Sequence, residues 1–164
     1  MSKGRVWKYG DDVNTDVIFP GRYTYQLMEP AEMAKHAMED LDPGFAKNVK
    51  PGDVVVGGKN LGCGSSREQA AACLRAAGVQ AVVAKSFARI YFRNAINLGL
   101  AVLQCEEASD ALKTGDEVDI DFAGGKILSG GRVFKFFPLP DSVIGIIEAG
   151  GLIEYTKKKL ASTR

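Results

Sequence analysis

The chain has 164 residues, 46% of them hydrophobic and 25% charged, with a formal net charge of +1. This length suits one ordinary domain with its own core, so we expect residues 1–164 to form a single domain. The balanced charge gives no bulk attraction for nucleic acid or for an anionic membrane surface, and we expect neither as a partner.

Targeting and metal signals are weak along the chain. Residues 1–10 lack an apolar core with a cleavage site, and no apolar stretch approaches the roughly 20 residues that span a bilayer, so we expect a cytoplasmic protein. The three cysteines, Cys63, Cys73 and Cys105, are odd in number and lack CxxC spacing. That pattern is typical of neither a disulfide framework nor a self-contained metal site, so we expect small buried side chains and no bound metal.

In chain order, an aromatic loop over residues 20–28 precedes a surface helix expected over residues 30–40, and two βα repeats follow. Strands that alternate with helices of this length predict a parallel sheet with right-handed crossovers. The expected strands cover residues 53–58, 79–84 and 100–105, and the expected helices cover residues 67–77 and 87–98.

The last third of the chain changes character. Residues 117–122 alternate apolar and acidic side chains, and two glycine pairs separate them from a further apolar run over residues 133–137. This pattern predicts a small antiparallel sheet. A helix over residues 141–149 and a short basic tail are expected to finish the chain.

The segment GCGSSRE, residues 62–68, carries the clearest chemical signal. It places the hydroxyls of Ser65 and Ser66 and the guanidinium of Arg67 at a helix N-terminus after a strand, where free N–H groups favour a carboxylate or a phosphate. A second interpretation needs no function, because Ser65 and Glu68 fit an S-x-x-E capping box. The segment lacks the third glycine of a dinucleotide fingerprint and the G-K-[ST] of a P-loop, which argues against nucleotide binding.

Three stretches in the same order, DDVNTDVIFPG, GCGSSREQAA and AKSFARIYFRNAINLGL, resemble the small subunits of 3-isopropylmalate dehydratase and homoaconitase, which correspond to the swivelling fourth domain of aconitase. The likeness runs from Val6 to Leu160. It implies an α/β fold, a three-layer swivelling β/β/α domain with a mostly parallel central sheet and a small antiparallel part. It also implies a hydro-lyase of leucine biosynthesis, active only with a large subunit as a heterodimer or heterotetramer. In that assembly the large subunit carries a [4Fe–4S] cluster and this chain binds no cofactor.

The resemblance also assigns roles to single residues. It makes Ser65 the base that takes a proton from the carbon beside a carboxylate. Arg67 then holds a substrate carboxylate through paired N–H groups, and Ser66 donates to that carboxylate or to the Ser65 alkoxide. Asp16, in the NTD motif, matches an aspartate that reaches the active site, although such clusters also serve as turns or caps.

Two further features have open interpretations. Arg89 and Arg93 are spaced i,i+4 on an expected helix. The alternatives for them are a solvated or interface face, support of the GCGSSRE segment or of the large subunit, or a catalytic role. The chain has one histidine, His36, in a polar helical stretch, and we expect it to face solvent.

The loop with Arg22, Tyr23, Thr24 and Tyr25 matches the loop that contacts the substituent distinguishing one malate from another. Homoaconitase-like members carry an arginine shortly after the loop tyrosine, where this chain has Thr24 and Tyr25. A small malate with an apolar branch is therefore favoured, because burying a second carboxylate without a partner is costly. Tyr23 and Tyr25 are equally interpretable as core or interface aromatics.

Several functions fit these observations. The favoured one is isomerisation of 2- and 3-isopropylmalate, and the alternatives are a 2,3-dimethylmalate or citramalate dehydratase or a homoaconitase. The last would require Arg22 to turn into the pocket. A different class is a non-catalytic anion-binding domain, which the intact Ser65, Ser66 and Arg67 argue against.

Overall fold

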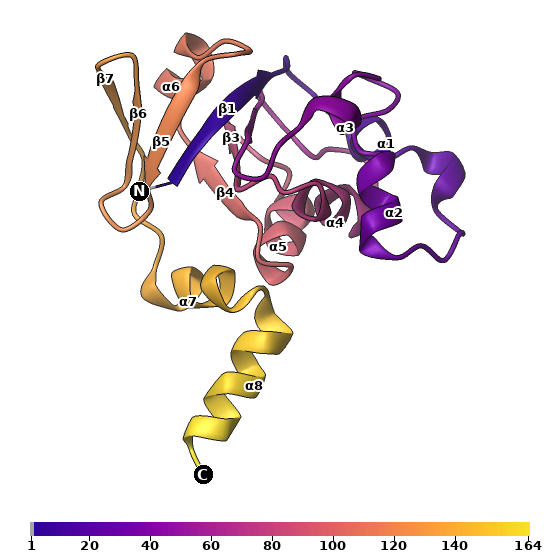
Figure 1. Ribbon diagram of the computed structural model, residues 1–164, viewed down its shortest axis with the longest axis vertical. Helices are drawn as coiled ribbons and strands as arrows, with labels where there is room; N and C mark the ends of the chain where they lie inside the picture. The colour runs from indigo at the N-terminus through magenta and orange to yellow at the C-terminus, as the bar shows by residue number, and fades with distance from the viewer. Residues whose placement is uncertain (1) are drawn as a thin grey trace.

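The computed structural model of the protein describes residues 2–164, and its strands form one curled sheet (Figure 1). The strand order is β4-β3-β2-β1-β5-β6-β7. The strands are β1 (Ser2–Lys8), β2 (Val54–Val56), β3 (Ala81–Ala84), β4 (Ala101–Gln104), β5 (Glu117–Asp121), β6 (Lys126–Ser129) and β7 (Arg132–Lys135).

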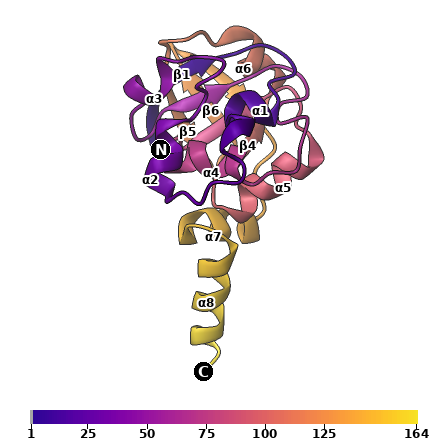
Figure 2. The same cartoon turned by 90° about the vertical axis from the view of Figure 1, so that its right-hand side faces the viewer.

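Helices of very different lengths connect or flank these strands. Those between β1 and β4 lie mostly on one side of the sheet, and the last two follow β7 (Figures 1 and 2). The helices are α1 (Thr15–Ile18), the 3₁₀ helix η1 (Gly21–Tyr23), α2 (Pro30–Lys35), α3 (Phe45–Asn48), α4 (Gln69–Ala76), α5 (Arg89–Asn97), α6 (Glu106–Ala111), α7 (Asp141–Ala149) and α8 (Leu152–Ser162).

β1 joins the two halves of the sheet. It pairs in parallel with β2, Val6 opposite Val54, and antiparallel with β5, Gly4 opposite Val118. The sequence analysis predicted the parallel and the antiparallel half of the sheet but missed β1. A glycine and three charged residues interrupt the apolar pattern of this strand. The glycine has a structural cause: a Cβ at Gly4 would lie 1.8 Å from the carbonyl oxygen of Gly52.

The parallel strands are apolar because both of their faces are covered. Val55, Val82 and Val102 face a core that they share with helices α1 to α5. Val54 and Val83 face a second core, closed by α6 and by the antiparallel strands. The result is three layers, antiparallel strands, parallel strands and helices, which confirms the expected β/β/α arrangement.

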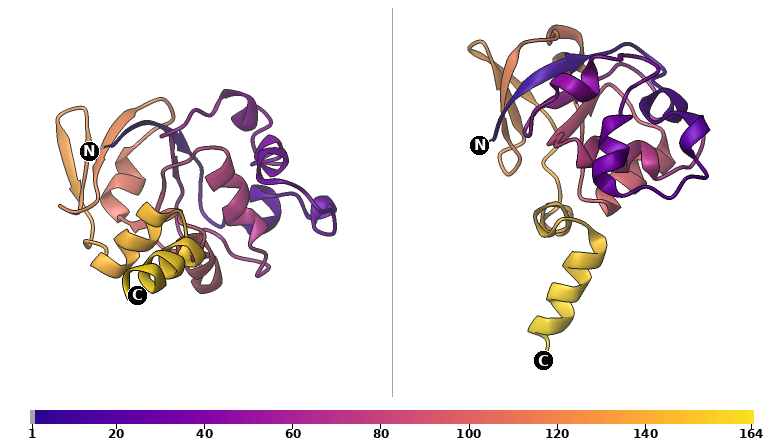
Figure 3. Two further views of the ribbon diagram at one scale, coloured as in Figure 1. Left: turned by 60° about the horizontal axis from the view of Figure 1, so that its bottom comes forward. Right: turned by 45° about the vertical axis from the view of Figure 1, so that its right-hand side comes forward.

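Two expectations about helices were wrong. The helix expected over residues 30–40 is α2, which ends at Lys35 because Ala37 and Met38 turn into the core and are completely buried. The expected basic tail is helix α8, which extends away from the rest of the molecule (Figure 3). Its residues are mostly strong helix formers, and Gly150 and Gly151, both with positive φ, separate it from α7.

No helix in the described part of the chain, residues 2–164, is long and apolar enough to cross a lipid bilayer.

Asp53 fixes the start of β2 against β1. Its buried carboxylate accepts hydrogen bonds from Trp7 Nε1 (2.9 Å) and from the backbone N–H groups of Lys50 (2.9 Å) and Arg5 (3.1 Å). Burial alone would raise the pKa of Asp53, but these hydrogen bonds outweigh it, so the pKa lies below its usual value.

Replacing this carboxylate tests its contribution. We expect Asp53→Asn to lower the free energy of unfolding by about 2 kcal/mol near neutral pH, because an amide replaces a charged acceptor of three donors. A depressed pKa gives stability above the unfolded-state value of about 3.9, which is lost as pH falls through the folded-state value. Urea unfolding from about pH 7 to about pH 3 should therefore show the difference from wild type narrowing towards acid. The control is Glu107→Gln on the exposed surface, and a pH-independent difference would contradict the assignment.

Candidate active site

The candidate site lies where the carboxyl ends of β1 and β2 meet. Because these strands are parallel, the segments that follow them leave the sheet at the same edge. Their backbones are joined there, since Gly62 N–H donates to Val13 O (2.7 Å) and Thr15 N–H donates to Cys63 O (2.8 Å). Residues about 50 positions apart in the sequence thus form one surface.

Glycine is required in the GCGSSRE segment. Gly62 has φ 83°, and a Cβ there would lie 2.2 Å from Cγ of the buried Tyr91. Gly64 has φ 103°, and a Cβ there would lie 3.2 Å from Thr15 Oγ1. The segment therefore passes against α5 on one side and against α1 on the other.

Ser65 does not cap a helix. α4 begins at Gln69, its N-cap Glu68 makes no side-chain cap hydrogen bond, and residues 65–68 lie outside the helix. The Ser65 Oγ instead lies 2.9 Å from Thr15 Oγ1 and accepts a hydrogen bond from Arg67 Nε (2.8 Å). The capping-box interpretation was wrong, because the side chain turns towards α1 rather than along its own helix.

Arg67 connects three segments of the chain. Besides Ser65, its guanidinium donates to Thr24 Oγ1 on the loop after η1 and to Asp16 Oδ1 on α1. Only 14% of the Arg67 side chain is exposed, whereas 65% of the Asp16 side chain is exposed. The guanidinium is thus held in place, and one of its partners stands at the open surface.

The three residues of the NTD motif, Asn14, Thr15 and Asp16, have different structural roles. Asn14 is the N-cap of α1, and its Oδ1 accepts from the N–H groups of Asp16 (2.9 Å) and Val17 (3.1 Å). Thr15 is buried beneath Ser65, and Asp16 pairs with Arg67. Asn14 is therefore the capping residue of the motif, and the active-site role of Asp16 stays a prediction.

The sequence analysis missed three residues that hold the site in place. Thr15 could have been found, because it stands next to Asp16 in the NTD motif. Asn94 Nδ2 on α5 donates to the carbonyl of Ser66 (3.0 Å), and Gln69 Nε2 donates to the carbonyl of Thr24 (3.1 Å). Amides that hold backbone carbonyls follow no sequence motif, and only the packing reveals them.

The segment that comprises η1 and the loop after it has two parts that face different surroundings. Arg22 turns away from Ser65, because its guanidinium pairs with Asp40 (2.9 Å) and Glu39 (2.9 Å). At the other end Tyr25 is 99% exposed and Leu27 is fully exposed, so the loop tip presents apolar side chains to its surroundings.

Tyr23 anchors this loop to the body of the molecule. Its ring centroid lies 4.1 Å from that of His36 and 6.0 Å from that of Phe19. His36 also shares a 2.7 Å hydrogen bond with Glu39 through Nδ1. The expectation of a solvent-facing His36 was therefore wrong, since its ring packs beneath the loop.

Arg89 and Arg93 are both exposed on the outer surface of α5, next to Ile90, which is 50% exposed. The interpretation of this surface as an interface with a partner stays a prediction.

The three cysteines lie in different surroundings. Cys73 and Cys105 are buried in the two separate cores, while Cys63 is only half-buried because its segment crosses the surface. Burial raises the pKa of the Cys73 and Cys105 thiols. No group of three or more His, Cys, Asp or Glu among residues 2–164 is arranged to hold a metal ion. Among these described residues, the cysteines do not form the ligand set of an iron–sulfur cluster.

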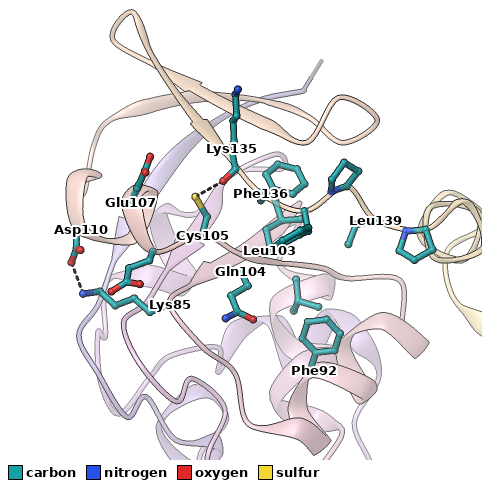
Figure 4. A pocket seen from close by; sticks show the side chains of 15 residues that line it. Lys85, Phe92, Leu103, Gln104, Cys105, Glu107, Asp110, Lys135, Phe136 and Leu139 are labelled. Atoms are coloured by element: carbon teal, nitrogen blue, oxygen red, sulfur yellow. Dashed lines mark hydrogen bonds and ion pairs between the residues drawn. The ribbon is translucent and has the colours of Figure 1, made fainter.

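An open hollow of about 950 Å³ lies elsewhere, between β4, α6 and the segment that leads from β7 to α7 (Figure 4). At its rim Lys85 pairs with Asp110, and the Cys105 Sγ donates to the carbonyl of Lys135 (3.4 Å). Neither Ser65 nor Arg67 lines this hollow, so it is separate from the candidate site.

The chain is similar to known proteins over nearly its whole length. The aconitase C-terminal domain family matches residues 23–108. A 3-isopropylmalate dehydratase small subunit of Thermodesulfovibrio yellowstonii is 49% identical over 97% of this chain and 95% of that relative. The isopropylmalate/citramalate isomerase small subunit of Methanocaldococcus jannaschii is 49% identical over 99% of this chain and 97% of that relative.

The fold is also similar to a solved structure. The crystal structure of 3-isopropylmalate dehydratase from Methanocaldococcus jannaschii superposes with a TM-score of 0.91 and 45% sequence identity, over 98% of this chain and 96% of that chain.

The glycine requirement gives a test with a matched control. We expect Gly62→Ala to lower the free energy of unfolding by more than about 3 kcal/mol, because the methyl group meets Tyr91 in addition to the positive φ. Gly115, at φ 96°, has open space where a Cβ would lie, with nothing within 4 Å, so Gly115→Ala carries the backbone strain alone and should cost about 1 kcal/mol. Thermal or urea unfolding measures both, and equal losses would contradict the close packing of Gly62 on Tyr91.

Proposed function

Because the chain belongs to the family of 3-isopropylmalate dehydratase small subunits, we propose that it is the small subunit of a hydro-lyase that interconverts 2- and 3-isopropylmalate. It supplies the serine base and the residues that bind a substrate carboxylate, and a large subunit completes the site. The observation that carries this proposal is the joining of Ser65, Arg67 and Asp16 at one edge of the sheet.

Ser65 is the proposed base. A serine hydroxyl is a weak base unless its alkoxide is stabilised, and the Arg67 Nε–H at 2.8 Å is a charged donor suited to that purpose. The Ser65 alkoxide takes the proton from the carbon beside a substrate carboxylate. The electron pair of that C–H bond then forms a carbon–carbon double bond while the neighbouring C–O bond breaks. The hydroxyl leaves as water after it takes a proton from an acid on the large subunit. Addition of water in the opposite sense gives the isomer.

Arg67 and Ser66 are the proposed carboxylate site. A substrate carboxylate competes for the guanidinium N–H group that donates to Asp16, and the exposure of Asp16 leaves that carboxylate free to turn towards the large subunit. Ser66 is exposed beside Arg67, and its hydroxyl is a second donor for the same carboxylate.

The proposed substrate carries an apolar branch. Arg22 is already paired with Glu39 and Asp40, so it offers no free cation for an additional substrate carboxylate. The exposed Tyr25 and Leu27 supply apolar surface at the loop tip instead. Citramalate and 2,3-dimethylmalate, with smaller branches, are the alternatives, and the activity for which the relative from Methanocaldococcus jannaschii is named includes citramalate.

The partner is a large subunit that carries a [4Fe–4S] cluster, in a heterodimer or heterotetramer located in the cytoplasm. The family relationship supports this proposal, together with a donor set in this chain that does not fit such a cluster. The cluster supplies the Lewis acid of the reaction, and the work of this chain is confined to the proton and the carboxylate.

Removing the base tests the central claim. We expect Ser65→Ala to reduce turnover of 3-isopropylmalate by about 10³-fold in the complex with the large subunit, with assembly unchanged. Initial rates under anaerobic conditions measure this, with 2,3-dimethylmalate, citramalate and homocitrate compared as substrates. The matched control is Ser142→Ala on the exposed surface of α7, and wild-type turnover in Ser65→Ala would remove Ser65 as the base.

The loop arginine separates the two substrate classes. We expect Arg22→Ala to change turnover of 3-isopropylmalate and of homocitrate in the same proportion, within about fivefold, because its guanidinium supports the loop rather than the substrate. A selective loss of homocitrate turnover would instead assign the chain to a homoaconitase.

A further inference from the structure

Thr15 contacts the segment that carries Ser65 at three points. Its side chain is 1% exposed, and its Oγ1 lies 2.9 Å from Ser65 Oγ. The same oxygen accepts the backbone N–H of Ser65 (3.0 Å), and the Thr15 N–H donates to Cys63 O (2.8 Å). The residue thus holds both the backbone and the hydroxyl of Ser65 from the buried side.

The number of protons decides the direction of the hydroxyl contact. Thr15 Oγ1 accepts from the Ser65 N–H, and its hydroxyl also carries one proton that it can donate. The Ser65 Oγ accepts from Arg67 Nε, and an alkoxide has no proton of its own. Whenever Ser65 is ionised, Thr15 must therefore be the donor in the 2.9 Å contact.

We propose that Thr15 is a positioning residue for the base: its hydroxyl fixes the Ser65 Oγ and, together with Arg67, donates to the alkoxide. This inference rests on the proposed role of Ser65. Thr15 touches neither the substrate nor the transferred proton, and its hydrogen bond remains when Ser65 becomes neutral again.

A neutral donor suits this place for a physical reason. Arg67 divides its N–H groups among Ser65, Thr24 and Asp16, and it must also meet the substrate carboxylate. A buried hydroxyl adds a second donor to the alkoxide without attracting that carboxylate.

The backbone conformation at Gly64 also keeps Ser65 close to Thr15. Gly64, immediately before Ser65, brings the chain so close to Thr15 that a Cβ would lie 3.2 Å from Thr15 Oγ1. Its positive φ of 103° is needed for the same approach. The turn is therefore built around the threonine hydroxyl.

The test compares Thr15→Val, Thr15→Ser and Ser65→Ala in the complex with the large subunit. Val preserves the shape and removes the hydroxyl, so we expect kcat to fall by about 30-fold while KM for 3-isopropylmalate stays within about threefold. Ser keeps the hydroxyl and should restore kcat to within about threefold of wild type. The control is Thr114→Val, because the Thr114 Oγ1 also accepts a backbone N–H, that of Lys8 (2.9 Å), away from the site.

The pH profile distinguishes electrostatic positioning from mere support of the turn. Loss of a donor to the charged form raises the pKa of the Ser65 hydroxyl, so the limb of the kcat/KM profile that reports its ionisation should move to higher pH in Thr15→Val. A structural role alone would lower the rate without moving this limb.

The outcomes separate the two levels of the proposal. Wild-type kcat and pH profile in Thr15→Val, with turnover abolished in Ser65→Ala, overturn the role of Thr15 alone. Wild-type turnover in Ser65→Ala overturns the proposed function itself. If Thr15→Val fails to assemble with the large subunit, Thr15→Cys repeats the test with a weaker donor. A wild-type profile in that variant overturns the inference, and a lower kcat with the limb at higher pH supports it.

Discussion

The parallel pairing of β1 with β2 determines where the chemistry of this chain lies. It brings the segment after β1 and the segment after β2 to one edge of the sheet, so that α1 supports the GCGSSRE segment. Asp53 fixes this pairing from the opposite end of β2 through donors on β1. Without this register, Thr15 and Asp16 would not meet Ser65 and Arg67.

Within the site, each group has a distinct electrostatic task. Arg67 provides a fixed positive charge, Asp16 balances it at the surface, and Thr15 gives a neutral contact from below. Such donors are far more effective in a site that excludes water than in one that is open. Ser65 and Ser66 are exposed in this chain by itself, so the proposed chemistry requires another surface to exclude water from them.

The buried parallel strands differ from the exposed elements at the ends of the molecule. Both faces of the parallel strands are buried, which makes the edge that carries the site rigid. Among the exposed apolar side chains, Tyr25 and Leu27 lie at the loop tip and Ile153 lies on α8. Exposed apolar side chains of this kind suit contacts with a partner.

The sequence by itself determined the parallel and antiparallel parts of the sheet, because buried parallel strands read as apolar runs. It also indicated the main residues of the candidate site, because GCGSSRE is a local motif, while the layer arrangement was implied by the family resemblance. It did not determine β1, the helical form of residues 152–162 or the true start of α4. Strand β1 is stabilised by its two neighbours rather than by its own pattern, and the partner of Ser65 is set by α1, not by a capping box. Only the tertiary structure decided that Arg22 faces Glu39 and Asp40 while Thr15 faces Ser65, because such contacts join segments that are far apart in the sequence.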